Sequence, residues 1–248
     1  MKHREYNTAL VTGASAGIGR ATVERLAKEG LKIHAVARNM EKLRALATST
    51  GCHIHAVDVR DTAAMQNLVD RLEVDVLVNN AGLQRMTSIL EDSEDDIDAQ
   101  IAVNLTAVLQ LVRLVMPGMV RRDRGHIINI SSTAAIYRFE SSSTYHAAKA
   151  GIHALSQQLR IDGYGHRVRI TEICPGRTQT DLFATAVGDS LEAKERFFDG
   201  YEVLQPADIA DAIAYAINAP PHVNISNIEI VSTMQVPGGL RFAKSALA

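Results

Sequence analysis

The sequence predicts an α/β fold: a doubly wound, seven-stranded parallel sheet with helices on both faces. Short runs rich in valine and isoleucine alternate along the chain with longer amphipathic segments. The short runs are apolar throughout, which is typical of parallel strands that are covered on both sides. Regular alternation of strand and helix, joined by right-handed crossovers, then gives a doubly wound sheet.

The elements are expected in the following order. Strands, each a short run rich in β-branched residues, are predicted at Thr8–Val11, Lys32–Ala37, His53–Val57, Val74–Val78, His126–Ile130, Arg167–Ile173 and Asn227–Val231. Helices, each with apolar residues at helical spacing, are predicted at Gly17–Glu29, Met40–Thr48, Ala63–Arg71, Ile97–Val120, Thr144–Tyr164 and Pro206–Asn218. The stretch Gly176–Gln205 has no clear period, and a loop of this length often covers a binding site.

The composition is that of an ordinary globular protein. Hydrophobic residues make up 46% and charged residues 22%, which excludes a disordered or fibrous chain. The net charge of −2 gives no basic excess that would favour nucleic acid, and the cluster Arg121, Arg122 and Arg124 is interpreted as a solvated helix end. The two cysteines, Cys52 and Cys174, are interpreted as buried thiols, so we expect neither a disulfide framework nor a thiolate metal site.

No segment of the sequence predicts membrane insertion or export. The most apolar helical stretch, near Leu105–Val120, contains Gln110, Arg113 and Pro117, and we do not expect it to span a bilayer. The polar start Met1–Asn7 leads directly into the first strand, unlike a targeting segment. We therefore expect a cytoplasmic protein of one domain, residues 1–248.

A glycine-rich turn joins the first predicted strand to the first predicted helix. It reads Thr12-Gly13-Ala14-Ser15-Ala16-Gly17-Ile18-Gly19. Gly13 can make the sharp turn, Gly17 lets the backbone approach a ligand, and Gly19 allows the helix to pack closely on the strand. The N–H groups at the helix start then point at an anion such as a pyrophosphate. A tight turn without a ligand is the alternative.

The ends of the second and third strands indicate which dinucleotide would bind. An NAD site usually has an acidic residue after the second strand, whereas this chain has Arg38 and Asn39 there. A guanidinium pairs well with a 2′-phosphate, which favours NADP over NAD. The alternative interpretation is that Arg38 is a surface cation at that edge and binds no phosphate. Asp58 and Val59 follow the third strand and could hold the adenine, although Asp at a strand end is also ordinary turn chemistry.

Several polar residues are expected at one crevice. Tyr145 and Lys149 are four residues apart in a predicted helix and share a face. A neighbouring ammonium lowers the pKa of a tyrosine, which is otherwise about 10. Such a pair alone is usually structural. Ser132 ends the fifth strand, Asn79-Asn80-Ala81-Gly82 ends the fourth and Asn104 lies in the crossover helix, so all face the edge where parallel sheets bind ligands.

Together these motifs resemble the short-chain dehydrogenases/reductases. The matching elements are Thr12–Gly19, Asp58, Asn79–Gly82, Asn104, Ser132, Tyr145-x-x-x-Lys149 and Pro175-Gly176. Ser132 and Tyr145 are thirteen residues apart, a spacing typical of the family. The resemblance implies a Rossmann fold, with a cofactor half at about residues 1–130 and a catalytic and substrate half at about 131–248.

The resemblance also implies a role for each matching residue. Tyr145 would be the general acid–base, Lys149 would lower its pKa and bind the nicotinamide ribose, Ser132 would orient the substrate carbonyl, and Asn104 would hold a water that links Lys149 to solvent. Further cofactor contacts are implied for Asn80, Ala81, Gly82, Pro175, Gly176, Thr178 and Thr180. Many NADP-preferring members have a basic residue where this chain has Ala16, so Arg38, helped by Ser15 and Asn39, would select the cofactor.

Two further segments narrow the resemblance. Met116–Val120 with Gly125–Ile130, and Pro220–Ile225, look like the branch that contains serine and 3-hydroxy-acid dehydrogenases and sulfoacetaldehyde reductases. That branch implies a small, polar and often anionic substrate. Candidate anion partners are Arg85, Arg138, Arg177 and Arg241, and further candidate pocket residues are Tyr137, Phe139, His146, Phe183, Phe197 and Phe198.

Three questions stay open in the sequence. A reductase of neutral ketones, sugars or polyols is the alternative substrate class, and a dinucleotide-sensing protein without turnover is a more distant one. The family resemblance implies a homotetramer or a homodimer, formed through the two long predicted helices. Packing in the core of one subunit would explain the apolar residues of these helices equally well. The histidines show no metal-ligand spacing, and hydride transfer of this kind needs none, so no catalytic metal is expected.

Overall fold

Seven parallel strands form the centre of the molecule in the computed structural model, which describes residues 6–236 and residue 242. Their order in the sheet is β3-β2-β1-β4-β5-β6-β7. The strands are β1 (Thr8–Thr12), β2 (Lys32–Ala37), β3 (His53–Ala56), β4 (Val76–Asn79), β5 (Gly125–Ile130), β6 (Val168–Pro175) and β7 (Asn227–Ile230). The predicted doubly wound α/β fold is confirmed.

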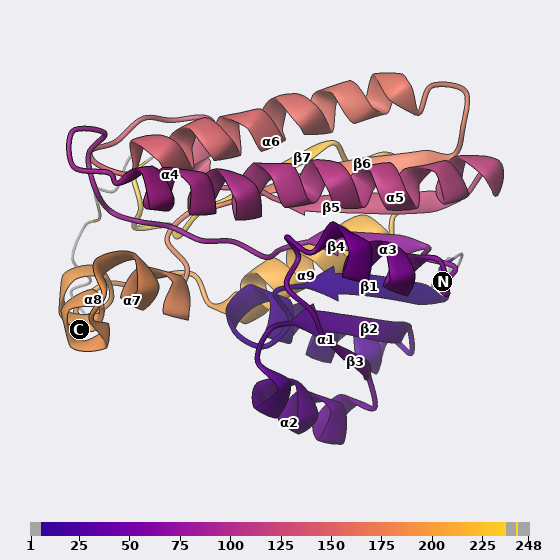
Figure 1. Cartoon of the computed structure of the whole chain (residues 1–248), viewed down its shortest axis with the longest axis horizontal. Coiled ribbons are helices and arrows are strands. Elements are labelled where there is room, and N and C mark those ends of the chain that lie inside the picture. Colours follow the sequence, from indigo (N-terminus) through magenta and orange to yellow (C-terminus); the bar gives the residue numbers. More distant parts are fainter. Residues whose placement is uncertain (1–5, 237–241, 243–248) are drawn as a thin grey trace.

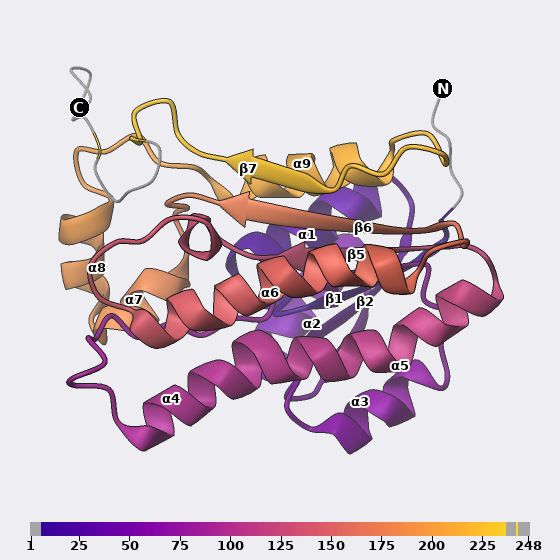
Figure 2. The ribbon, with the colours of Figure 1, turned by 90° about the horizontal axis from the view of Figure 1, so that it is seen from above.

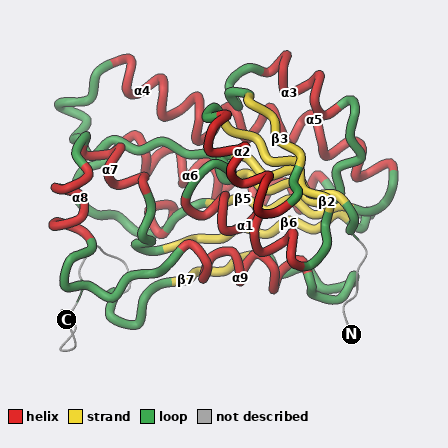
Figure 3. Tube along the Cα trace, turned by 90° about the horizontal axis from the view of Figure 1, so that it is seen from below, coloured by secondary structure: helices red, strands yellow, loops and turns green. Residues whose placement is uncertain are grey.

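Helices cover both faces of this sheet (Figure 1). One face carries α1 (Gly17–Lys28), α2 (Met40–Thr50) and α9 (Pro206–Ile217), which lie in front of the strands in Figure 3. The other face carries α3 (Thr62–Val69), α4 (Glu94–Ile101), α5 (Ala107–Arg121) and α6 (Ser143–Asp162). Successive strand residues point to opposite faces, so Val11 packs with α1 and Leu10 packs with α5.

The long crossover helix is not regular over its whole length. Helical structure begins at Glu94, three residues before the predicted start, because Ser93 caps it by accepting a hydrogen bond from Asp96 N at 3.1 Å. A π-helical turn, η1 (Ala102–Thr106), separates α4 from α5. The continuous stretch Glu94–Arg121 is long and apolar enough to cross a membrane, as the core helix of a soluble protein also can be. Its buried side chains pack on the sheet.

Two short helices occupy the segment that the sequence predicted to be a loop. They are α7 (Asp181–Val187) and α8 (Ser190–Phe197). Gly188 ends α7 with a φ of +85°, and Asp189 caps α8 by accepting from Leu191 N and Glu192 N. Each helix is too short to show a clear apolar period. Figure 2 shows both at the end of the sheet toward which β6 and β7 point.

Candidate active site

A cavity of about 390 Å³ lies at the carboxyl ends of the strands. Most of the sequence-predicted site residues line it. They are Gly13, Ser15, Ala16, Gly17, Ile18, Arg38, Asp58, Val59, Asn80, Ala81, Gly82, Ser132, Tyr145, Lys149, Pro175, Gly176, Arg177, Thr178 and Thr180. The fold therefore brings together side chains and turns that are as much as 167 residues apart in sequence, from Gly13 to Thr180.

The glycine-rich turn needs its glycines for conformation and for space. Gly13 and Gly17 have φ values of +65° and +50°, which favour glycine. Gly19 does not line the cavity but packs behind the turn, where a Cβ would lie 2.3 Å from the Gly13 carbonyl oxygen. Ala16 precedes α1 and offers its first turn no side-chain acceptor, so those N–H groups are open to a ligand. A Cβ on Gly17 would lie 3.1 Å from Thr180 Cγ2, which places the turns after β1 and β6 together.

Two arginines line the end of the cavity beside β2 and β3. Arg38 is exposed at the end of β2. Arg60 was missed in the sequence, although it follows Asp58 by only two residues. It donates from Nη2 and Nε to the Asp58 carboxylate at 2.7 and 3.0 Å, and this hydrogen bonding lowers the pKa of Asp58. Asn39 does not line the cavity; it caps α2, and its Oδ1 accepts from Lys42 N at 2.9 Å.

Tyr145, Lys149 and Ser132 meet at the other end of the cavity. Tyr145 and Lys149 lie on one face of α6, and only 6% and 5% of their surfaces are exposed. Lys149 Nζ lies 5.6 Å from the centre of the Tyr145 ring and donates to the Ile130 carbonyl at 2.8 Å. Ser132 follows β5, and its Oγ accepts a hydrogen bond from Ala134 N at 3.1 Å.

The pKa values of this pair shift because both groups are buried. Burial raises the pKa of Tyr145 to about 12, and a hydrogen bond with Ser132 offsets part of the rise. Burial lowers the pKa of Lys149 to about 8, while nearby Cys174 and the Glu172 carboxylate offset part of the fall. The net shift of the Tyr145 pKa is upward because desolvation of the phenol outweighs the hydrogen bond with Ser132, and the lowering expected from Lys149 stays a prediction.

Glu172 forms a polar cluster behind Lys149. It is 2% exposed on β6. Its Oε2 accepts from His153 Nδ1 at 2.7 Å and from Asn227 Nδ2 at 3.0 Å. His153 lies one turn after Lys149 on α6, so the cluster reaches from the buried amine to a partly exposed imidazole. We expect this carboxylate to favour the charged form of Lys149.

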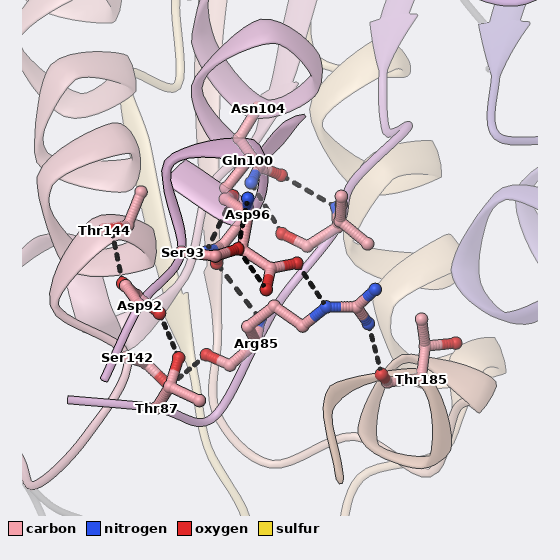
Figure 4. A network of polar contacts seen from close by, with 11 residues as sticks. Arg85, Thr87, Asp92, Ser93, Asp96, Gln100, Asn104, Ser142, Thr144 and Thr185 are labelled. Carbon is pink, nitrogen blue, oxygen red and sulfur yellow. Dashed lines mark hydrogen bonds and ion pairs between the residues drawn. The ribbon is translucent and has the colours of Figure 1, made fainter. Parts of the chain in front are cut away.

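Asn104 lies behind the cavity wall, inside the π-helical turn. Its side chain is fully buried, its Oδ1 accepts from Leu83 N at 3.0 Å, and its Nδ2 donates to the Leu83 carbonyl at 2.6 Å (Figure 4). Single π turns occur frequently at functional sites. The side chain thus fixes the segment after β4, and the implied water link to Lys149 stays a prediction.

The four candidate anion partners have different surroundings. Arg177 lines the cavity, but its guanidinium also packs 4.1 Å from the Phe242 ring centre and donates to the Phe197 carbonyl at 3.1 Å. Arg85 lies outside the cavity lining and pairs with Asp96. Arg241 lies outside the described residues.

The structure does not place Arg138 in the cavity, contrary to its assignment to the substrate. Its Nη1 donates to the carbonyls of Ala134, Ala135 and Tyr137 at 3.0 to 3.4 Å, because the turn after β5 directs these oxygens toward it. Arg138 and His146 line a separate surface depression, which Phe139 shares with the cavity.

Of the other predicted aromatic residues, some line the cavity and others lie outside it. The Tyr137 hydroxyl lies 3.2 Å from Glu229 Oε2 and is outside the cavity lining. Phe183 lines the cavity and packs against Phe197 and Phe198, with ring centres 4.9 and 5.4 Å away. Besides Arg60, further lining residues were missed in the sequence because no local motif marks them, among them Gln84, Met86, Leu182 and Gln235.

Comparison with known proteins identifies the family of this fold and site. Residues 7–190 match the model of the short chain dehydrogenase family, and the chain belongs to that family. It is 39% identical over 240 residues to an uncharacterized short-chain type dehydrogenase/reductase, y4eK, from Sinorhizobium fredii, covering 96% of each chain. It is 36% identical over 241 residues to the NADP-dependent 3-hydroxy acid dehydrogenase YdfG from Escherichia coli, covering 93% of this chain and 97% of that one.

Its fold is also similar to that of a solved dehydrogenase. The closed form of serine dehydrogenase complexed with NADP+ superimposes with a TM-score of 0.90 and 34% identity. The match covers 96% of this chain and 100% of that chain. The protein is therefore an oxidoreductase of the short-chain dehydrogenase family, and the predicted resemblance is confirmed.

Proposed function

We propose that the protein is an NADP-dependent dehydrogenase that transfers hydride between nicotinamide and a small polar hydroxy or carbonyl compound. The observation that carries this proposal is one cavity with the glycine-rich turn and Arg38 at one end and Tyr145, Lys149 and Ser132 at the other. The bound cofactor supplies a carbon that donates or accepts hydride, and the protein places and stabilises the reacting groups.

The residues at the cofactor end fit a dinucleotide with a 2′-phosphate. Gly13 and Gly17 line the cavity beside the start of α1, and the N–H groups of the first turn of α1 would bind the pyrophosphate. Arg38 would bind the 2′-phosphate, since a guanidinium fork suits a phosphate, and Arg60, whose Nε and Nη2 donate to Asp58, would add positive charge beside it. Two similar proteins, the 3-hydroxy acid dehydrogenase and the serine dehydrogenase, are both described with NADP, which supports the same choice here.

The residues at the other end fit proton transfer to a carbonyl oxygen. Tyr145 would donate its hydroxyl proton to that oxygen during reduction and take it back during oxidation. Ser132 would donate a hydrogen bond to the same oxygen and stabilise its developing charge. Lys149 would bind the nicotinamide ribose, and its ammonium would stabilise the phenolate of Tyr145.

We propose a short hydroxy acid or a sulfonate-type alcohol or aldehyde as the substrate. Two similar proteins act on 3-hydroxy acids and on serine, according to their names. Arg177 lies within the turn after β6 that lines the cavity, and it would bind the acid group. Met86, Leu182 and Phe183 give the same cavity an apolar wall, which favours neutral ketones as the second candidate.

Assembly and location are part of the same proposal. We propose a homotetramer or a homodimer in the cytoplasm. Leu109 on α5 and Ile161 on α6 expose 44% and 67% of their surfaces, which supports burial against another copy. Sedimentation of the full chain as a monomer at micromolar concentration would contradict the assembly.

A cofactor and substrate screen tests the proposal. NADPH and NADH are each combined with small aldehydes, ketones, oxo acids and sulfonated aldehydes, and loss of the reduced nicotinamide is followed by absorbance. We expect turnover of an anionic short carbonyl compound with NADPH. Turnover of neutral ketones alone would refute the substrate class, and turnover with NADH alone would refute the cofactor.

A further inference from the structure

The segment of residues 83–87, which follows β4, is held to the crossover helix at two points. Asn104 bonds both the N–H and the carbonyl of Leu83. One helical turn earlier, the fully buried Gln100 accepts from Arg85 N at 3.0 Å. Figure 4 shows Asn104 and Gln100 one turn apart on the helix, with their hydrogen bonds to this segment as dashed lines. The backbone at Arg85 is therefore fixed from the inside of the molecule.

The side chain of Arg85 extends from this fixed backbone to α7. Its Nε donates to Asp96 Oδ1 at 3.0 Å, and its Nη1 donates to the Thr185 carbonyl at 2.7 Å (Figure 4). The next residue, Met86, donates its N–H to the Ala186 carbonyl at 3.2 Å. The last carbonyls of a helix have no donor within that helix. Arg85 and Met86 thus supply donors to two carbonyls in the last turn of α7.

Helix α7 forms a wall of the active-site cavity. Leu182, Phe183 and Thr185 line the cavity from α7, and Gln84 and Met86 line it from the segment that α7 contacts. Arg85 lies between these two residues but does not line the cavity itself. Its guanidinium is directed to α7 and Asp96, which does not fit the anion-binding role considered for it in the sequence.

We propose that Arg85 is a positioning residue that fixes α7 over the substrate end of the cavity and thereby strengthens substrate binding. This inference rests on the proposed function for its kinetic consequence. The contact joins the segment held by Asn104 to the helix that carries Leu182 and Phe183. When the contact between Arg85 and α7 is lost, fewer hydrogen bonds hold the apolar wall over the substrate. The contacts at the cofactor end of the cavity, beside Arg38, are unchanged.

The fork of the guanidinium is essential to this role. Arg85 reaches Asp96 with Nε and Thr185 with Nη1, whereas a lysine has a single nitrogen. The side chains of Arg85 and Asp96 are 36% and 38% exposed, and exposed ion pairs contribute little to global stability. Substitution should therefore loosen α7 without unfolding the protein.

Amide hydrogen exchange tests the contact without any substrate. The ligand-free full chain is compared with Arg85→Ala, Arg85→Lys and Asp96→Asn, and exchange is measured over residues 181–187. We expect faster exchange there in all three variants, with Arg85→Ala the fastest. The matched control is Arg20→Ala, which removes an exposed arginine with a 2.8 Å partner, Glu24, on α1. Unchanged exchange over 181–187 in Arg85→Ala would overturn the proposal.

Steady-state kinetics tests the consequence for the substrate. We expect KM for the carbonyl substrate to rise about tenfold in Arg85→Ala, equivalent to about 1.4 kcal/mol, with kcat and the KM for NADPH close to those of the parent. Full recovery in Arg85→Lys would overturn the proposal, since it would show that charge alone is needed. Absence of turnover in the parent would refute the proposed function, and the exchange measurement would still decide whether Arg85 fixes α7.

Discussion

Lys149 lies over the ring of Tyr145, with its Nζ 5.6 Å from the ring centre, because the two residues are four apart on α6. The same Nζ donates to the Ile130 carbonyl at 2.8 Å, which holds the amine at the carboxyl end of β5. Ser132 follows that strand by two residues. One helix and one strand end therefore bring the three reactive side chains to the same place.

Removal of the Ser132 hydroxyl should slow the chemical step. In Ser132→Ala the substrate oxygen loses a donor, and we expect kcat to fall roughly 100-fold with little change in cofactor affinity. Ser132→Thr keeps the hydroxyl and should recover much of the rate. Because Ser132 Oγ also accepts from Ala134 N, the melting temperature is measured alongside. An unchanged kcat in Ser132→Ala would show that this hydroxyl has no catalytic part.

The alkaline limb of the pH profile should depend on Glu172. The pKa of Lys149 is about 8, so carbonyl reduction should decline as the pH rises through that value and the ammonium is lost. The Glu172 carboxylate favours the ammonium. In Glu172→Gln this negative charge is removed, the pKa of Lys149 falls further, and the alkaline limb moves to lower pH.

A matched substitution separates this effect from a general change of charge. Glu24→Gln removes a carboxylate on α1, where its partner is Arg20, and should leave the limb in place. The kcat of each variant is measured across the pH range. A limb at the same pH in Glu172→Gln and in the parent would show that Glu172 does not act on Lys149.

Arg38 should distinguish NADPH from NADH. In Arg38→Ala we expect KM for NADPH to rise about 10-fold to 100-fold, the range for a lost hydrogen bond between charged groups, and KM for NADH to change little. The control is Arg44→Ala, an exposed arginine on α2. Equal losses with both cofactors in Arg38→Ala would place this residue away from the 2′-phosphate.

His34 should make folding stability fall in mild acid. It is buried on β2, its Nδ1 lies 3.0 Å from His55 Nε2, and its ring stacks on His53. Burial, with smaller contributions from His55, His53 and Lys32, lowers the pKa of His34 from 6.5 to about 4. The unfolded chain therefore takes up a proton before the folded one, and stability is lost as the pH falls from 6.5 toward 4.

The expected loss of folding free energy is about 1–2 kcal/mol. This is less than the full pKa shift of His34 would give, because the neighbouring His53 is exposed to solvent. Thermal unfolding is measured from neutral to acid pH for the parent and for His34→Gln. We expect a shallower loss of stability in the variant, whereas His222→Gln, on an exposed turn, should follow the parent. Identical pH slopes for His34→Gln and the parent would contradict the prediction.

The sequence predicts the strands well, because a buried parallel strand is a short apolar run. Lys32–Ala37 has its predicted bounds. The fourth strand begins at Val76 and not at Val74, because Asp75 bonds the chain before the ladder begins: its Oδ2 accepts from Asn7 N and Thr8 N. The motif residues could be placed at the cavity from the sequence, since the ends of parallel strands meet at one edge.

Contacts between segments without a periodic pattern could not be predicted. Arg138 and Arg85 are both basic residues near strand ends, yet one bonds carbonyls of its own turn and the other bonds α7. The helices α7 and α8 are too short to leave an apolar period. The net pKa shift of Tyr145 depends on its burial against the whole fold, which no spacing of residues expresses.

The most direct test of the account is the turnover of Tyr145→Phe beside the parent, with NADPH and the best carbonyl substrate of the screen. The ring stays in place and only the hydroxyl is lost, so we predict that kcat falls by a factor of roughly 100 or more while the affinity for NADPH is kept. Turnover by Tyr145→Phe at the rate of the parent would contradict the assignment of this residue as the acid–base and, with it, the proposed mechanism.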